Sequence, residues 1–300
     1  MRLAAWLLLT LPATGITACG SSDPGTDVDA APADPSVDAA PAVAPPVPTP
    51  TGTCPTLASG DVTFAPAGMA PRQVRLALDA SAVGPGPLLL YWHATGSSTQ
   101  EAAFALGADQ ASFTAAGGVV AAPTSDPTAG NFEWFIVNQS TRQDDFLLAD
   151  EIVACLVAAG RVDARHLHSM GMSAGALQTT ALSFVRSRYL ASVATYSGGL
   201  PPGVGVPGAD SSNRFAAMIF DGGASDTVFG VDFQAASAAY RANLDAAGHF
   251  TIGCDHGGGH SIPQDAAPSV LRFFADHAFA TEPSPYAGGL PAGFPTYCAP

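Results

Sequence analysis

Short apolar runs alternate with longer stretches of helical character along most of the chain. The apolar runs predict strands at Val74–Leu78, Leu88–Trp92, Val119–Ala122, His166–Met170, Ala216–Phe220 and Phe250–Gly253. The longer stretches predict helices at Ala102–Ala116, Phe146–Ala158, Ala174–Arg188, Phe233–Ala246 and Ser269–His277. Strands that alternate with helices of this length are typical of βαβ units. The expected fold class is therefore α/β, with a mostly parallel central sheet and helices on both faces.

The N-terminal part of the chain shows neither pattern. Residues 1–18 place an arginine before an apolar run from Leu3 to Ala13, which is shorter than the roughly 20 residues needed to cross a bilayer but typical of a secretory signal. Residues 19–53 contain no aromatic residue and are dominated by Ala, Pro and Asp, so they cannot bury enough apolar surface to fold. We expect a signal peptide at 1–18, a disordered tether at 19–53 and one folded domain at 54–300.

Composition supports a single large globular domain. The 300 residues are 47% hydrophobic and only 12% charged, which is enough for a full core. The net charge is −14, and all 11 basic residues are arginines that form no stripe along the sequence. This distribution argues against a nucleic-acid partner, and it favours neutral ligands over anionic polymers. We expect a monomer, and no metal-ligand spacing is present in the sequence.

One motif carries the chemistry of a nucleophile. Gly171–Gly175 reads G-x-S-x-G, in which the serine occupies a sharp turn from a strand to a helix and its neighbours at −2 and +2 must be very small. A predicted strand, His166–Met170, ends directly before the motif, and an Ala- and Leu-rich predicted helix follows it. This is the context that the motif requires, so Ser173 is the predicted nucleophile.

The motif implies a base and an acid further along the chain, in the order Ser, Asp or Glu, His. His256 and His260 share a glycine-rich loop between the last predicted strand and the last predicted helix. The three glycines before His260 allow its ring to reach the serine, so His260 is the predicted base and His256 the alternative. Asp226 is the predicted acid because it lies within the loop after Ala216–Phe220. Asp221 stays the second candidate, since it follows that strand at once.

Acyl transfer also needs two backbone N–H groups directed at the developing oxyanion. Ala174, directly after the nucleophile, is expected to supply one. The loop after Leu88–Trp92 is expected to supply the other through Thr95, with Ala94 as the alternative. Trp134 lies in an aromatic stretch that either lines the substrate pocket or belongs to the core.

Together these motifs resemble the exported polyhydroxybutyrate depolymerase and feruloyl esterase group of α/β-hydrolases. The resemblance covers roughly 60–300 and rests on the elbow at Gly171–Gly175 and the G-G-G-H loop at Gly257–His260. The sequence departs from the family at Ala94, where the family has glycine, and at Asp221, where it has histidine.

The resemblance implies an α/β-hydrolase fold and a serine esterase that uses Ser173, Asp226 and His260 without a cofactor or a metal. It implies a polyester or a feruloylated or acetylated polysaccharide as the ester substrate. A serine peptidase with the same triad, or an inactive surface-binding lipoprotein, is the alternative.

Cys19 follows Ile16-Thr17-Ala18, a sequence that resembles a bacterial lipobox. We therefore expect Cys19 to carry lipid and to anchor an exported protein to a membrane, facing the periplasm or the cell surface. If the segment is an ordinary signal peptide, the protein is secreted instead.

The other four of the five cysteines form an even set. In an oxidising compartment they are expected to form two disulfides, for which three pairings are possible. Cys254 with Cys298 is preferred because both flank the C-terminal segment, and this pairing leaves Cys54 with Cys155.

Overall fold

The computed structural model describes residues 43–130, 132–135, 142–202 and 212–300. The predicted signal peptide, the predicted lipid site at Cys19 and the first part of the predicted tether lie outside these residues. Among the helices that the structure describes, none combines the length and the apolar character needed to cross a membrane.

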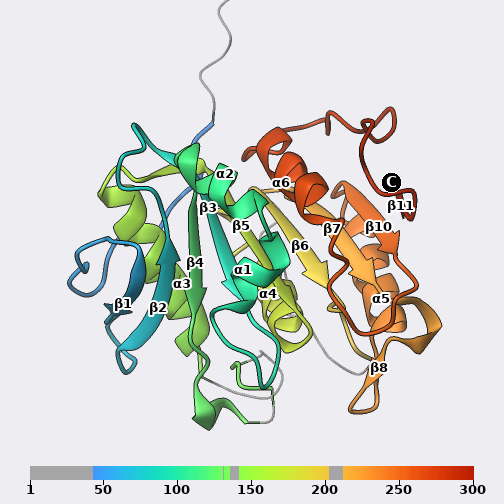
Figure 1. Ribbon diagram of the computed structural model, residues 1–300, viewed down its shortest axis with the longest axis horizontal. Coiled ribbons are helices and arrows are strands. Elements are labelled where there is room, and N and C mark those ends of the chain that lie inside the picture. The colour runs from blue at the N-terminus through green and yellow to red at the C-terminus, as the bar shows by residue number, and fades with distance from the viewer. Residues whose placement is uncertain (1–42, 131, 136–141, 203–211) are drawn as a thin grey trace, which may run out of the picture. The chain divides into compact units, whose positions relative to one another are not determined.

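A nine-stranded sheet forms the centre of the domain, in the order β1-β2-β4-β3-β5-β6-β7-β10-β11 (Figure 1). Its strands are β1 (Gly60–Phe64), β2 (Arg72–Ala77), β3 (Gly86–Trp92), β4 (Val119–Pro123), β5 (Val162–Met172), β6 (Ser192–Tyr196), β7 (Ala216–Asp221), β10 (Thr251–Asp255) and β11 (Cys298–Ala299). The strands from β4 to β10 pair in parallel, whereas β1, β2 and β11 pair antiparallel at the two edges. A separate two-stranded ribbon joins β8 (Thr227–Val228) to β9 (Val231–Asp232).

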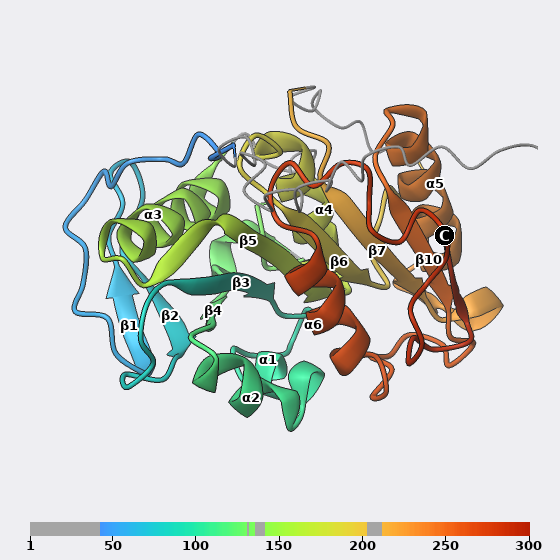
Figure 2. The same cartoon turned by 90° about the horizontal axis from the view of Figure 1, so that it is seen from above.

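Helices cover both faces of the sheet, with α3, α4 and α5 on one face and α1, α2 and α6 on the other (Figure 2). Their bounds are α1 (Glu101–Leu106), α2 (Asp109–Ala115), α3 (Asp144–Ala158), α4 (Ala174–Val185), α5 (Phe233–Ala246) and α6 (Ala267–Asp276). Alternate residues of β3 belong to different cores: Leu88 and Leu90 face one cluster, and Leu89 faces the other. Burial on both faces explains why this strand is a continuous apolar run in the sequence.

The predicted strands are all present, with ends that differ by a few residues. Three strands of the sheet were missed, and β11 is the shortest of them at two residues. β1 is a short edge strand with a weak alternating pattern. β6 is buried along its whole length although it includes Ser192 and Thr195, which interrupt the apolar run. Ser192 bonds to the ring of buried His168 at 2.8 Å, so one polar group of this strand is satisfied inside the protein.

The helix predicted at Ala102–Ala116 is wrong as a single element. Gly107 has a φ of +54° and ends α1, and α2 begins two residues later. The left-handed conformation is available to glycine at little cost, and it turns the chain out of the helix. The other predicted helices are confirmed, although α4 ends at Val185 rather than at Arg188.

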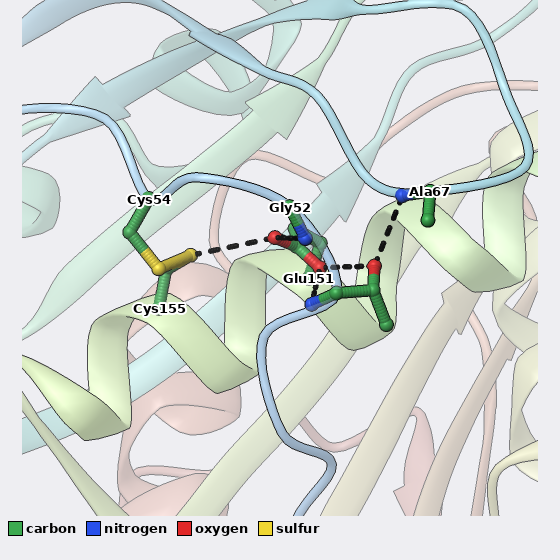
Figure 3. Close-up of a disulfide and its surroundings, with 6 residues drawn as sticks. Gly52, Cys54, Ala67, Glu151 and Cys155 are labelled. Atoms are coloured by element: carbon green, nitrogen blue, oxygen red, sulfur yellow. Dashed lines mark hydrogen bonds between the residues drawn. A yellow bond between two sulfur atoms is a disulfide. The ribbon is translucent and has the colours of Figure 1, made fainter.

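The boundary predicted at residue 53 also needs correction, because the chain already contacts the domain before it. Thr51 donates its N–H and its hydroxyl to the Glu151 carboxylate at 2.8 and 2.7 Å, and Gly52 donates its N–H at 2.9 Å (Figure 3). Glu151 lies on α3 and is buried. Composition alone could not reveal this contact, since it depends on backbone groups and one distant carboxylate rather than on apolar burial.

Both preferred disulfides are present in the structure. Cys54–Cys155 fastens the segment after Gly52 to α3, as Figure 3 shows. Cys254–Cys298 joins two residues that are directly paired between β10 and β11, so it holds the C-terminal tail at the edge of the sheet. The two bridges therefore tie the N-terminal segment of the described domain to α3 and its C-terminal tail to β10.

Candidate active site

Ser173 lies on a tight turn between the end of β5 and the start of α4. Its φ of +56° is unusual for a residue with a side chain and is the strained geometry that exposes a serine above a sheet. Glycine is required on both sides of it. A Cβ at Gly171 or Gly175 would overlap the carbonyl oxygen of Trp92 on the neighbouring strand β3.

The three residues predicted as a triad lie together at the carboxyl ends of β5, β7 and β10. Ser173 Oγ is 2.8 Å from His260 Nε2, and His260 Nδ1 is 2.7 Å from Asp226 Oδ1. Because an ionised carboxylate can only accept, His260 Nδ1–H donates to Asp226. Nε2 is then the acceptor for the serine hydroxyl, which is the tautomer that a general base needs.

Asp226 is fully buried, and its carboxylate accepts hydrogen bonds from several groups. Its Oδ2 accepts the hydroxyl of Ser197 and the backbone N–H of Gly222, each at 2.8 Å. Burial alone would raise the pKa of Asp226, but the hydrogen bonds from His260, Gly222 and Ser197 outweigh it and hold the pKa below its ordinary value. The carboxylate is therefore charged and fixed in position.

The loops that carry the acid and the base are joined through their backbones. Gly259 donates its N–H to the Gly222 carbonyl at 2.9 Å, and His256 donates its N–H to the Asp221 carbonyl at 3.0 Å. The ring of Phe233, the first residue of α5, lies 4.6 Å from the His260 ring between centroids. These contacts fix His260 relative to Asp226.

The two alternative triad members lie elsewhere. His256 accepts the N–H of Gly258 at Nδ1 and packs near Tyr297, and its burial lowers its pKa. Asp221 accepts the N–H of Gly223, and burial raises its pKa to about 6, helped by the nearby carboxylates of Asp255 and Asp226. Neither residue has a hydrogen bond to Ser173 or His260 in the described part of the chain.

The loop after β3 leaves one N–H group free. Ala94 donates its N–H to Glu101 at 3.0 Å, and Gly96 donates its N–H to Glu133 at 3.2 Å. Between them, the Thr95 N–H has no acceptor among the described residues. Ala94 was the alternative oxyanion donor, and its bond to Glu101 makes it unavailable. The N–H of Ala174, in the first turn of α4, has no partner within the helix.

Trp134 does not line the site. Its side chain is 1% exposed, its Nε1 donates to the His93 carbonyl at 2.9 Å, and its ring packs edge-on against Trp92. The substrate-binding role considered for Trp134 is wrong, because its side chain belongs to the hydrophobic core. It supports the start of the loop that carries Thr95.

A cavity of about 670 Å³ opens beside the nucleophile. Ser173, His260 and Thr95 all line it. Its walls are formed by Ala94, Thr95, Ser97, Ser98, Gln100, Glu101, Phe104, Met172, Ser173, Val228, Phe229, His260, Ser261, Ile262 and Gln264. Among the described residues no arginine lines this cavity, so they provide no guanidinium for a carboxylate or a phosphate.

Two supporting residues were not found from the sequence. Ser197 follows β6 with a φ of +50° and donates to Asp226. A serine before two glycines at a strand end was the available signal, but β6 itself was missed. Glu101 accepts from Tyr91 and from Ala94 at 3.0 Å each, and nothing in the local sequence indicated this role.

No protein-family model matches the sequence, and curated proteins give no match either. Solved structures do match. The native structure of pOPH is 18% identical with a TM-score of 0.65, and the match covers 82% of this chain and 95% of that one. The native structure of sOPH is 16% identical with a TM-score of 0.66, covering 84% and 96%.

An S-formylglutathione hydrolase from Agrobacterium tumefaciens is 13% identical with a TM-score of 0.54, covering 74% of this chain and 98% of that one. The strand order, the parallel centre of the sheet and these neighbours establish the α/β-hydrolase fold that the sequence predicts.

Proposed function

We propose that this protein is a serine hydrolase that cleaves carboxylic esters through an acyl-enzyme. The observation that carries the proposal is the hydrogen-bonded chain from Ser173 through His260 to Asp226, which begins in an open cavity. Proteins described as esterases share the same fold, which supports the reaction class.

In the first half of the reaction, Ser173 Oγ attacks the ester carbonyl while His260 Nε2 takes its proton. Asp226 keeps His260 in the required tautomer and stabilises the imidazolium that forms. The N–H groups of Ala174 and Thr95 donate to the oxyanion of the tetrahedral intermediate. The intermediate collapses when His260 returns the proton to the leaving alcohol, and the acyl group stays on Ser173.

In the second half, a water molecule gives a proton to His260 and attacks the acyl carbonyl. The second tetrahedral intermediate uses the same oxyanion donors. It releases the carboxylic acid and restores the Ser173 hydroxyl. Each step uses only groups of this chain and water.

The proposed substrates are polyesters or the feruloyl and acetyl esters of polysaccharides, as the resemblance implies. The open cavity, which no arginine of the described residues lines, supports a neutral ester. A panel of p-nitrophenyl butyrate, methyl ferulate, polyhydroxybutyrate film and a peptide substrate tests this, with Ser173→Ala as the control. We expect hydrolysis of at least one ester and none of the peptide. Hydrolysis of the peptide alone would identify a peptidase instead.

We also propose that the protein is exported and anchored through lipid on Cys19, a residue outside the described part of the chain. Two disulfides in the domain support an oxidising compartment. Wild-type protein is expected with membranes and Cys19→Ala in the soluble fraction, with its activity retained. Soluble wild-type protein with an unmodified Cys19 would contradict the anchor and leave the esterase proposal intact.

A further inference from the structure

Exposed aromatic rings gather at the candidate site. Four large hydrophobic side chains are exposed in the described part of the chain, namely Val43, Val83, Phe104 and Phe229. Phe104 is 59% exposed and Phe229 is 84% exposed, and both line the cavity that contains Ser173. Single exposed hydrophobic residues are common on soluble proteins, but two rings at one cavity mark a binding surface.

The two rings come from elements on different faces of the sheet. Phe104 belongs to α1, whose buried residues Ala102 and Leu106 pack into one core cluster. Phe229 lies at the tip of the β8–β9 hairpin, whose residues Val228 and Val231 pack against the other cluster. The cavity is therefore bounded by aromatic rings from two independent supports.

The backbone at Phe229 is unfavourable for its side chain. Phe229 and Gly230 form the two-residue connection of the hairpin, with φ values of +51° and +77°. Turns with positive φ at both central positions favour Asn-Gly or Gly-Gly, because a bulky side chain there is strained. A phenyl ring held in this conformation while mostly exposed gains little from packing within the protein. A contact with a ligand would account for it.

Both supports are also connected to the catalytic groups. Glu101, in the first turn of α1, holds the Ala94 N–H next to Thr95. The hairpin begins one residue after Asp226, and Phe233 at its end donates its N–H to the Asp226 carbonyl at 2.9 Å. The elements that carry the two rings are thus linked to the oxyanion loop and to the acid.

We propose that Phe104 and Phe229 form an aromatic clamp for esters that carry apolar groups on both sides of the scissile bond. This proposal rests on the esterase function above and narrows its substrate class. Two rings from opposite supports serve two portions of the substrate, the acyl group and the alcohol. An aliphatic polyester or a long-chain ester offers an apolar chain to each ring, so the clamp favours these substrates.

Four esters separate the two sides of the bond: ethyl acetate, ethyl hexanoate, hexyl acetate and hexyl hexanoate. We expect the wild type to prefer hexyl hexanoate. Phe104→Ala and Phe229→Ala should each lower kcat/KM by about tenfold for esters with a long chain on one side, and the side should differ between them. The double variant should lose the preference for either chain, so that its kcat/KM for hexyl hexanoate approaches its kcat/KM for ethyl acetate.

Two controls separate the ring from the backbone. Phe229→Asn removes the ring but suits the positive φ of the hairpin. Its kcat/KM for the long-chain esters should therefore fall as much as that of Phe229→Ala. Val83→Ala changes a side chain that is 99% exposed and outside the cavity, and it should match the wild type. Hydrolysis of an aliphatic polyester film that is lost with the double variant would identify a polymer as the source of the apolar chains. If the double variant loses activity on hexyl hexanoate but not on the film, small esters are the source of the apolar chains.

An active double variant with an unchanged chain-length preference would overturn the clamp and leave the esterase function standing. An inactive wild type on all four esters would instead overturn the function on which the clamp rests.

Discussion

The two sides of the candidate site are held by different kinds of contact. On the triad side, the two loops are joined by backbone contacts. The Gly222 carbonyl accepts the Gly259 N–H, and a Cβ at Gly222 would overlap the Gly259 carbonyl. On the oxyanion side, the carboxylates of Glu101 and Glu133 hold the N–H groups before and after Thr95. The first arrangement depends on close packing of glycines, and the second depends on two replaceable side chains.

This difference teaches which changes the site tolerates. A substitution of a triad residue or of one of these closely packed glycines either removes a reacting group or disturbs the fold, so its effect is large. A substitution of a carboxylate on the oxyanion side shifts a loop whose other contacts persist, so its effect is graded.

The largest effect is expected from His260→Ala, because members of a triad act as a unit. We expect kcat to fall by about 10⁴-fold or more without a change in melting temperature. His256→Ala is the matched control, since it removes a histidine of the same loop that bonds to neither Ser173 nor Asp226, and its kcat should stay within a few-fold. Steady-state kinetics on p-nitrophenyl butyrate measure both. A dead His256→Ala with an active His260→Ala would reverse the assignment of the base.

Gly175→Ala tests the packing of the elbow. Alanine normally stabilises a helix relative to glycine by up to about 1 kcal/mol, yet here its Cβ would overlap the Trp92 carbonyl. We expect unfolding to become easier by about 1–3 kcal/mol, measured by chemical denaturation. Gly288→Ala, at a position with open space around it, should leave stability within about 0.5 kcal/mol. Equal stability of the two variants would mean that the elbow is not closely packed.

Glu101→Ala tests the side-chain support of the oxyanion loop. We expect kcat to fall by about tenfold with little change in KM, below the 10²–10³-fold cost of losing an oxyanion donor outright. Glu101→Gln should recover most of the activity, because its amide oxygen can accept the Ala94 N–H. If both variants raise KM and leave kcat unchanged, Glu101 acts on substrate binding and not on the loop.

Asp221→Asn should have the smallest effect, on stability alone. The pKa of Asp221 is raised in the folded protein to about 6, above its ordinary value near 4, so ionisation opposes folding. The cost is absent below about pH 4 and grows as pH rises through the window to about 6. Asp221→Asn should therefore raise the melting temperature at pH 7.5 and have less effect at pH 4. A variant that is less stable at pH 7.5 would contradict this sign.

Much of the fold could be predicted because the central strands are apolar on both faces and the helices are long. Strand β6 could not be predicted, since its buried Ser192 and Thr195 resemble loop residues in the sequence. The break at Gly107 depends on a single left-handed residue within an otherwise helical stretch.

The relation of Ser173, Asp226 and His260 was predictable because the elbow and the G-G-G-H loop impose a chain order. The supports at Ser197 and Glu101 were not, because they join segments that are far apart in the sequence through single hydrogen bonds. For the same reason, the sequence left Ala94 and Thr95 undecided, and only the bond from Ala94 to Glu101 separates them.

The central claim is that Ser173 is the nucleophile of an acyl-enzyme. Treatment with a p-nitrophenyl phosphonate ester, followed by mass spectrometry of the digested protein, tests it most directly. The account predicts one phosphonyl group per molecule, on the peptide that contains Ser173, in proportion to the loss of esterase activity, and no labelling of Ser173→Ala. Activity that persists in Ser173→Ala, or inactivation with the label on another residue, would contradict it.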